Sequence, residues 1–199
     1  MANFTGISAA GTSIERLLTA SFVEEQPVPG KVTRAYLVRT EDFVKTKGNL
    51  SFALPALTLF LYRIDFNKTM RAAWSAVGSF DGRGHLPVDL HFLVTAWADN
   101  AEYEHRILGR TLQCLETTPI LSGPLLYPDP QADWATNEAV QLSLEEISTE
   151  AVMRTFDSLP VDYKLSIPYI ARVIRLDSRA AYPSPPVNTV ATGVKAGST

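Results

Sequence analysis

The sequence lacks the features of several large protein classes. It contains one cysteine, Cys114, so an intramolecular disulfide is excluded and a reducing compartment is expected. Its 18 basic and 21 acidic residues give a net charge of −3, without the basic stripe of a nucleic-acid-binding protein. No apolar run approaches the roughly 20 residues that span a bilayer, and no signal peptide is visible. We therefore expect a cytoplasmic protein that binds neither nucleic acid nor membrane.

Motifs for catalysis, metal binding and cofactor binding are also missing. The three histidines, His85, His91 and His105, are spaced unlike the usual metal signatures, and no second cysteine joins them. No Gly-x-Ser-x-Gly nucleophile elbow occurs. The glycine-rich segment 78–84 precedes a predicted strand, whereas a phosphate loop opens a helix, so we interpret it as a flexible loop. The sequence therefore predicts no catalytic residue, no metal site and no cofactor.

Four groups of residues could be interpreted as parts of a catalytic or binding site. Asp89 and His91 lie two residues apart on one face of a predicted strand, close enough in principle for the orienting pair of a small hydrolase. A polar pair that satisfies itself at the sheet margin is the simpler interpretation. The other groups are Glu102, Glu104 and Glu116; Glu145 and Glu146; and Trp74, Trp97 and Trp134. We interpret them in turn as a solvated helix face, weak evidence for a cation site, and core or interface residues.

Hydrophobic periodicity predicts an α+β fold, with a single domain in which helices flank one mixed β-sheet. Helices are expected at 7–22, 99–115 and 148–158, with a brief helical turn after Thr40. Strands are expected at 35–39, 55–66, 87–98, 139–147 and 163–176. Segment 67–86 is either a short helix or a mobile loop, and 119–137 is a long loop. The domain is expected to cover 1–177, and the proline- and glycine-rich segment 178–199 to form a flexible tail.

Three details of this prediction are specific enough to test. Asp99 and the glutamate three residues later have the spacing of a helix capping box. The second strand is apolar on both faces, so we expect it inside a covered sheet with Phe60, Tyr62 and Ile64 on one face. Pro168 has no N–H to donate, so it predicts that the first half of the last strand lies at a sheet edge or contains a bulge.

Three segments carry a resemblance to one protein family. They run from Leu86 to Arg110, from Ala139 to Leu159 and from Tyr163 to Ile174. The first is the most specific, because the strand LPVDLHFLVTAWA and the helix motif EHRILGR follow each other without a gap. Together they resemble the cap, or tail-terminator, subunits of extracellular contractile injection systems, which are phage-tail-like particles.

The resemblance implies a structural protein, not an enzyme, with a fold similar to phage tail terminators. It implies a ring of six subunits that ends tube and sheath polymerisation at the baseplate-distal end, so the partners would be further copies, the inner-tube protein and the sheath protein. It also implies assembly in the bacterial cytoplasm into a particle that is released. Two alternatives stay open: a baseplate or adaptor subunit of the same particle, and the small hydrolase that uses Asp89 and His91.

A ring subunit needs exposed anchors for its neighbours, and the sequence offers them in loops and in the tail. We predict contacts to subunits, tube or sheath from Met70, Trp74, Phe80, Leu125, Tyr127, Trp134 and Tyr182. Ordinary packing within the monomer is the alternative for each residue. The tail is expected to reach a neighbour, including by adding a strand to an exposed sheet edge.

Overall fold

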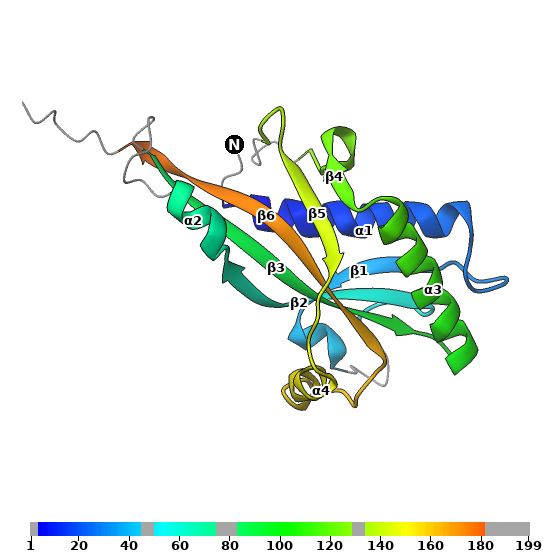
Figure 1. The fold of residues 1–199 in the computed structure, drawn as a ribbon. Helices are drawn as coiled ribbons and strands as arrows, with labels where there is room; N and C mark the ends of the chain where they lie inside the picture. Colours follow the sequence, from blue (N-terminus) through cyan, green and yellow to red (C-terminus); the bar gives the residue numbers. More distant parts are fainter. Residues whose placement is uncertain (1–3, 45–49, 75–82, 129–133, 182–199) are drawn as a thin grey trace, which may run out of the picture.

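The chain folds around one six-stranded mixed β-sheet (Figure 1). The computed structural model describes residues 4–44, 50–74, 83–128 and 134–181. Its strands are β1 (Arg34–Val38), β2 (Ala56–Phe66), β3 (Arg83–Trp97), β4 (Ile120–Ser122), β5 (Ala139–Leu144) and β6 (Ser166–Ala181). Its helices are α1 (Gly6–Glu24), α2 (Lys68–Trp74), α3 (Ala101–Thr117) and α4 (Thr149–Asp157), with the 3₁₀ helices η1 (Thr40–Phe43) and η2 (Gly123–Leu125). Within these ranges, no helix combines the length and the apolarity needed to cross a bilayer.

The strand order across the sheet is β1-β2-β3-β6-β5-β4. β1 runs parallel to β2, and all other neighbouring strands are antiparallel. The central strands β3 and β6 are the longest, with 15 and 16 residues. They extend beyond the rest of the sheet together with α2 and the end of β2 (Figure 1). We call this extension the arm, which comprises the described residues 63–74, 83–89 and 174–181. The mixed sheet with flanking helices confirms the predicted α+β fold.

The larger core lies between the sheet and helices α1 and α3, which pack on the same face. The helices contribute buried residues at helical spacing: Ala10, Ile14, Leu18 and Phe22 from α1, and Ile107, Leu108, Cys114 and Leu115 from α3. They pack against alternate residues of β3 from Val88 to Ala96, as the sequence predicted for that strand. Burying each large side chain contributes roughly 1.5–3 kcal/mol, so this layer supplies most of the apolar stabilisation.

The opposite face of the sheet is covered by α4 and η1. Phe43 of η1 and Phe52 pack against Trp97, with ring centroids 5.8 and 5.5 Å away. Leu93 packs against buried side chains of α4. This face of β3 therefore ends in buried apolar residues at its C-terminal part.

The start of α3 corrects one predicted cap. The N-cap is Asn100, because its side-chain oxygen accepts a hydrogen bond from the Tyr103 N–H at 2.9 Å. The predicted cap at Asp99 is therefore wrong, and Asp99 instead forms an ion pair with Lys31. At α4 the helix predicted for 148–158 is confirmed; Ser148 is its N-cap, and the Ser148 hydroxyl accepts a hydrogen bond from the Ala151 N–H.

Two connecting segments contain more structure than periodicity alone indicates. The predicted loop 119–137 includes β4 and η2, because Leu121 is fully buried and pairs with Val140 of β5. In 67–86 the helix alternative is correct, since α2 occupies Lys68–Trp74. Residues 75–82 lie outside the described part of the chain.

A β-bulge in β2 decides which side chains share a face. Leu61 and Arg63 pair with consecutive residues of β3, so Tyr62 is the extra residue. Arg63 and Asp65 therefore take the face on which Ile64 was predicted to lie. Ile64 lies on the other face, where 47% of it is exposed. The predicted continuous apolar face is wrong beyond the bulge.

β6 is an interior strand, between β3 and β5. Its pairing with β5 begins at Tyr169, and the Pro168 carbonyl accepts a hydrogen bond from the Glu145 N–H at 3.0 Å. The predicted edge is therefore limited to Ser166 and Ile167, which pair with β3 alone. The strand continues through Ser178 to Ala181, and residues 182–199 lie outside the described part.

Candidate functional site

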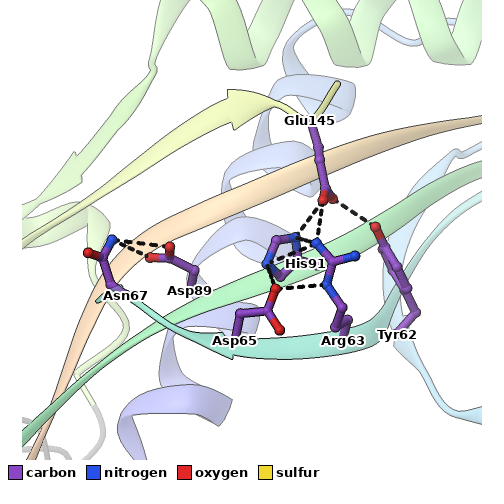
Figure 2. A network of polar contacts seen from close by, with 7 residues as sticks. All are labelled: Tyr62, Arg63, Asp65, Asn67, Asp89, His91 and Glu145. Carbon is purple, nitrogen blue, oxygen red and sulfur yellow. Dashed lines mark hydrogen bonds and ion pairs between the residues drawn. The ribbon is translucent and has the colours of Figure 1, made fainter. Parts of the chain in front are cut away.

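A cluster of polar side chains lies on the face of the sheet that carries α4 (Figure 2). Glu145, directly after β5, is at its centre, and 10% of its side chain is exposed. Its carboxylate accepts hydrogen bonds from the Tyr62 hydroxyl and from Arg63 Nη2, both at 2.7 Å, and lies 2.8 Å from His91 Nδ1. These three partners come from β2 and β3. Glu145 therefore fixes the link between β5 and α4 to the centre of the sheet.

His91 is held between two carboxylates. Nδ1 faces Glu145, and Nε2 lies 3.3 Å from Asp65 Oδ2. Arg63 Nε lies 3.0 Å from the same Asp65 oxygen. Both ring nitrogens of His91 therefore face carboxylates, and Arg63 contacts the same two acids. We call Tyr62, Arg63, Asp65, His91 and Glu145 the Glu145 network.

The network shifts the pKa values of two of its members. Burial alone would raise the pKa of Glu145, but hydrogen bonds from His91 and Tyr62, with the charges of His91 and Arg63, lower it below its ordinary value of 4.5. The pKa of Tyr62 is raised, first by burial and then by its hydrogen bond to Glu145. Glu145 therefore stays ionised and Tyr62 stays protonated near neutral pH, which keeps their hydrogen bond in place.

The structure separates Asp89 from His91. The Asp89 carboxylate accepts hydrogen bonds from Asn67 Nδ2 at 3.1 and 3.3 Å, whereas His91 contacts the Glu145 network (Figure 2). The predicted pair is therefore wrong, both as an orienting pair and as a polar pair that satisfies itself. The reason is geometric, because cross-strand neighbours in a sheet lie closer than residues i and i+2 of one strand. The network contains no serine, threonine or cysteine, the nucleophiles that a histidine activates in Ser-His and Cys-His hydrolases.

The other carboxylates singled out in the sequence have separate roles. Glu104 accepts a hydrogen bond from Lys164 Nζ at 2.6 Å, and Glu102 pairs with Arg106 on the surface of α3 at 2.8 Å. Glu146 is exposed, while its neighbour Glu145 is buried. Within the described ranges, no three histidine, cysteine or acidic residues are arranged to hold a metal ion.

Four of the predicted interface residues belong to the arm or follow described parts of it. Met70 lies in α2, its N–H donates to Asn67 Oδ1 at 3.0 Å, and its side chain is partly buried. Trp74 is the last residue of α2, and its side chain is outside the described part. Phe80 and Tyr182 also lie outside the described residues. Their contacts with a partner stay a prediction.

The arm exposes an apolar and basic surface that the sequence analysis missed. Phe66 is 49% exposed, and Arg71 lies over its ring at 5.2 Å from the centroid. We call the set Ile64, Phe66, Lys68, Arg71 and Leu86 the arm patch. Lys68 and Arg71 are exposed and form no ion pair with another described residue. The signal in the sequence was the apolar alternation from Ile64 to Phe66 that continues to the end of β2.

The predicted residues of the 119–137 segment differ in exposure. Leu125 ends η2 and is 42% exposed. The Tyr127 N–H donates to Ser13 Oγ at 2.7 Å, and Arg16 lies 5.4 Å from its ring centroid. Trp134 Nε1 donates to the Tyr127 carbonyl at 2.9 Å, and its ring packs against the larger core. Tyr127 and Trp134 thus tie this segment to α1 and the core, and Leu125 presents the exposed apolar surface.

The outer edge of β1 is closed by side chains. At and beside this edge, alternate N–H groups point away from β2 and have side-chain acceptors. Thr33 donates to Gln26 Oε1 (2.9 Å), Ala35 to Thr19 Oγ1 (3.2 Å) and Arg39 to Asp42 Oδ2 (3.0 Å). An edge strand with free N–H groups is a template for a foreign strand, so these bonds protect β1. β4, at the other edge, has only three residues.

The fold is similar to two solved caps of injection particles. One is the sheath/tube terminator of an extracellular contractile injection system, PVC, in its extended state, with a TM-score of 0.56 and 17% identity over 96% of this chain and 64% of that chain. The other is the tube-terminating cap of the anti-feeding prophage, with a TM-score of 0.55 and 17% identity over 93% of this chain and 60% of that chain. The chain therefore spans less than two thirds of the length of either cap.

Sequence comparison assigns the family independently of the fold. Among curated proteins, none matches the chain. A family model described as the Pvc16 N-terminal domain matches residues 9–189, which include every helix and strand except the first residues of α1. The chain belongs to the Pvc16 N-terminal domain family.

Proposed function

We propose that the protein is a structural subunit that caps the inner tube and the sheath at the baseplate-distal end of a contractile injection particle. The observation that carries the proposal is the similarity of fold over 96% of the chain to a sheath/tube terminator. Membership of the Pvc16 N-terminal domain family and the likeness to a tube-terminating cap support the same function.

The proposal includes a homo-oligomeric ring of six subunits, with the inner-tube protein and the sheath protein as partners. A closed ring with head-to-tail contacts needs two different surfaces on each subunit. The exposed apolar side chains of the arm patch and of Leu125 supply anchors of this kind. Met70, Trp74, Phe80, Tyr127, Trp134 and Tyr182 keep their proposed contact roles, and segment 178–199 is proposed to reach a neighbour.

The proposed role requires no catalysis, nucleic acid or membrane. Asp89 and His91, which the sequence offered to a hydrolase, bind different partners, and the Glu145 carboxylate is already occupied by three neighbours. A net charge of −3 gives no footprint for nucleic acid. We propose assembly in the bacterial cytoplasm and release as part of the particle, which cell fractionation and analysis of released particles would test.

Deletion of the gene followed by electron microscopy of the particles tests this function against its alternatives. Loss of a terminator predicts tubes and sheaths of uncontrolled length without a closed distal end, restored to uniform length by the wild-type gene. Loss of a baseplate or adaptor subunit predicts that tubes fail to nucleate. Particles of normal length and normal ends in the deletion strain would contradict the terminator function.

A further inference from the structure

A second exposed surface lies beside α4, away from the arm (Figure 1). It contains a groove of about 490 Å³ lined by Phe43, Val44, Leu159, Pro160, Val161 and Asp162. Asp157, at the end of α4, and Asp162 are exposed and form no ion pair with another described residue. We call the groove and these two aspartates the α4 patch. The side chains that line the groove are apolar except for Asp162, and Asp157 lies two residues before Leu159 in the chain.

The arm patch has the complementary chemistry. Phe66 projects an exposed aromatic ring, and Arg71 lies over it. Lys68 adds a second exposed cation; it lines a neighbouring hollow with Asp65 and Asp89 and forms no ion pair with another described residue. Binding hot spots usually contain an aromatic side chain that enters a pocket on the partner. Charged groups around it face charges of opposite sign at the rim of the pocket.

The two outermost strands, β1 and β4, offer little edge to a second copy, whereas β6 from Ile174 onward pairs with β3 alone. Three outward N–H groups at and beside β1 already have side-chain acceptors, and β4 offers only three residues. α1 also lies close to this edge, because a Cβ added at Gly11 would approach Leu37 Cδ2 to 3.1 Å. Extension of the sheet from one copy to the next therefore has no suitable edge at β1 and a very short one at β4.

We propose that the arm patch of one copy docks on the α4 patch of a second copy, with Phe66 in the groove and Lys68 and Arg71 beside Asp157 and Asp162. The occupant is a second copy because both complementary surfaces occur on this chain and lie at different ends of it (Figure 1). A contact between two different patches is heterologous, and a repeated heterologous contact closes into a ring when the rotation per subunit fits. The inference rests on the proposed function, for which it supplies the subunit contact.

Charge reversal tests this contact. Lys68→Glu/Arg71→Glu reverses the arm patch, and Asp157→Lys/Asp162→Lys reverses the α4 patch. In sedimentation at low salt we expect the wild-type chain to self-associate, and each reversed variant to associate at least about tenfold more weakly, because opposed charges now repel. Mixing equal amounts of the two variants should restore association. The acidic arm patch of the first variant then meets the basic α4 patch of the second, and the unchanged arm patch of the second meets the unchanged α4 patch of the first. Arg34→Glu/Arg106→Glu makes the same change in net charge as arm reversal but lies in β1 and α3, so it is expected to behave as wild type.

The outcomes separate this contact from the terminator function. Three results would each overturn the contact. The reversed variants could associate as strongly as wild type, their mixture could fail to recover association, or the wild-type chain could stay monomeric both free and on particle ends. If wild type and both reversed variants cap particle ends equally well, the contact is wrong and the terminator function stands. If the wild-type chain does not bind particle ends at all, the terminator function itself is wrong.

Discussion

Replacement of Glu145 by alanine removes the acceptor at the centre of the Glu145 network. Three contacts are lost, at 2.7 Å to Tyr62, 2.7 Å to Arg63 and 2.8 Å to His91. Hydrogen bonds to a charged group contribute about 1.5–3 kcal/mol each, but here they do not simply add. Arg63 is 43% exposed and keeps Asp65 at 3.0 Å, so water and Asp65 replace most of what it loses.

Tyr62 and His91 carry most of the loss. The Tyr62 hydroxyl loses its acceptor while it is partly buried, and His91, with 5% of its side chain exposed, keeps Asp65 at 3.3 Å. An unsatisfied buried polar group costs about 1–3 kcal/mol. We therefore expect Glu145→Ala to lower the free energy of unfolding by about 3 kcal/mol. For a chain of 199 residues this corresponds to a fall in Tm of roughly 6–12 °C.

Urea unfolding followed by circular dichroism measures this change. Glu146→Ala is the matched control, because Glu146 is adjacent, exposed and without a bonded partner in the described part of the chain, and we expect a change within about 0.5 kcal/mol. A double-mutant cycle with Tyr62→Phe should give a coupling free energy of about 1 kcal/mol for the Tyr62–Glu145 hydrogen bond. If Glu145→Ala costs no more than Glu146→Ala, or if the coupling is zero, the network does not stabilise the fold and the reasoning fails.

Three further predictions concern acid stability, the β1 edge and the thiol. The folded-state pKa of Glu145 lies below 4.5, so the stability difference between wild type and Glu145→Gln should be full above pH 4.5 and shrink as the pH falls further. Urea unfolding at several pH values measures this difference. A difference independent of pH would contradict the prediction. Thr19→Val removes the acceptor of the Ala35 N–H, so hydrogen exchange at Ala35 should accelerate about tenfold. The Tyr36 N–H, which points to β2, should exchange at an unchanged rate. Equal exchange at Ala35 in both proteins would show that the Thr19 hydroxyl does not protect the edge. Burial raises the pKa of Cys114, so a thiol reagent should react slowly in the folded chain and rapidly in denaturant, and rapid reaction of the folded chain would place Cys114 at the surface.

Elements governed by local sequence were predictable. α1 follows from apolar residues at helical spacing, of which Leu18 and Phe22 are fully buried. α4 follows likewise from Val152 and Phe156, which are four residues apart and buried. The bulge at Tyr62 was not predictable, because it appears only when β2 is paired with β3. The same holds for β4, which forms because Leu121 finds a partner on β5.

The site was less predictable than the fold, because its parts are distant in sequence. Glu145 meets Tyr62 and Arg63 across more than 80 positions, so no spacing rule connects them. Asp89 and His91 are close in sequence, and that closeness misled, since each side chain finds a nearer partner on another element. The charged residues within the otherwise apolar β2 were the available signal, because Arg63 and Asp65 mark the exposed end of the strand, where they pair with each other at 3.0 Å.

Cryo-electron microscopy of intact particles from the host that encodes this chain tests the central claim most directly. The account predicts a ring of this chain at the baseplate-distal end, with density that fits the six-stranded sheet and contacts both the last tube layer and the last sheath layer. Density for the chain at the baseplate, or a distal end closed without it, would contradict the account.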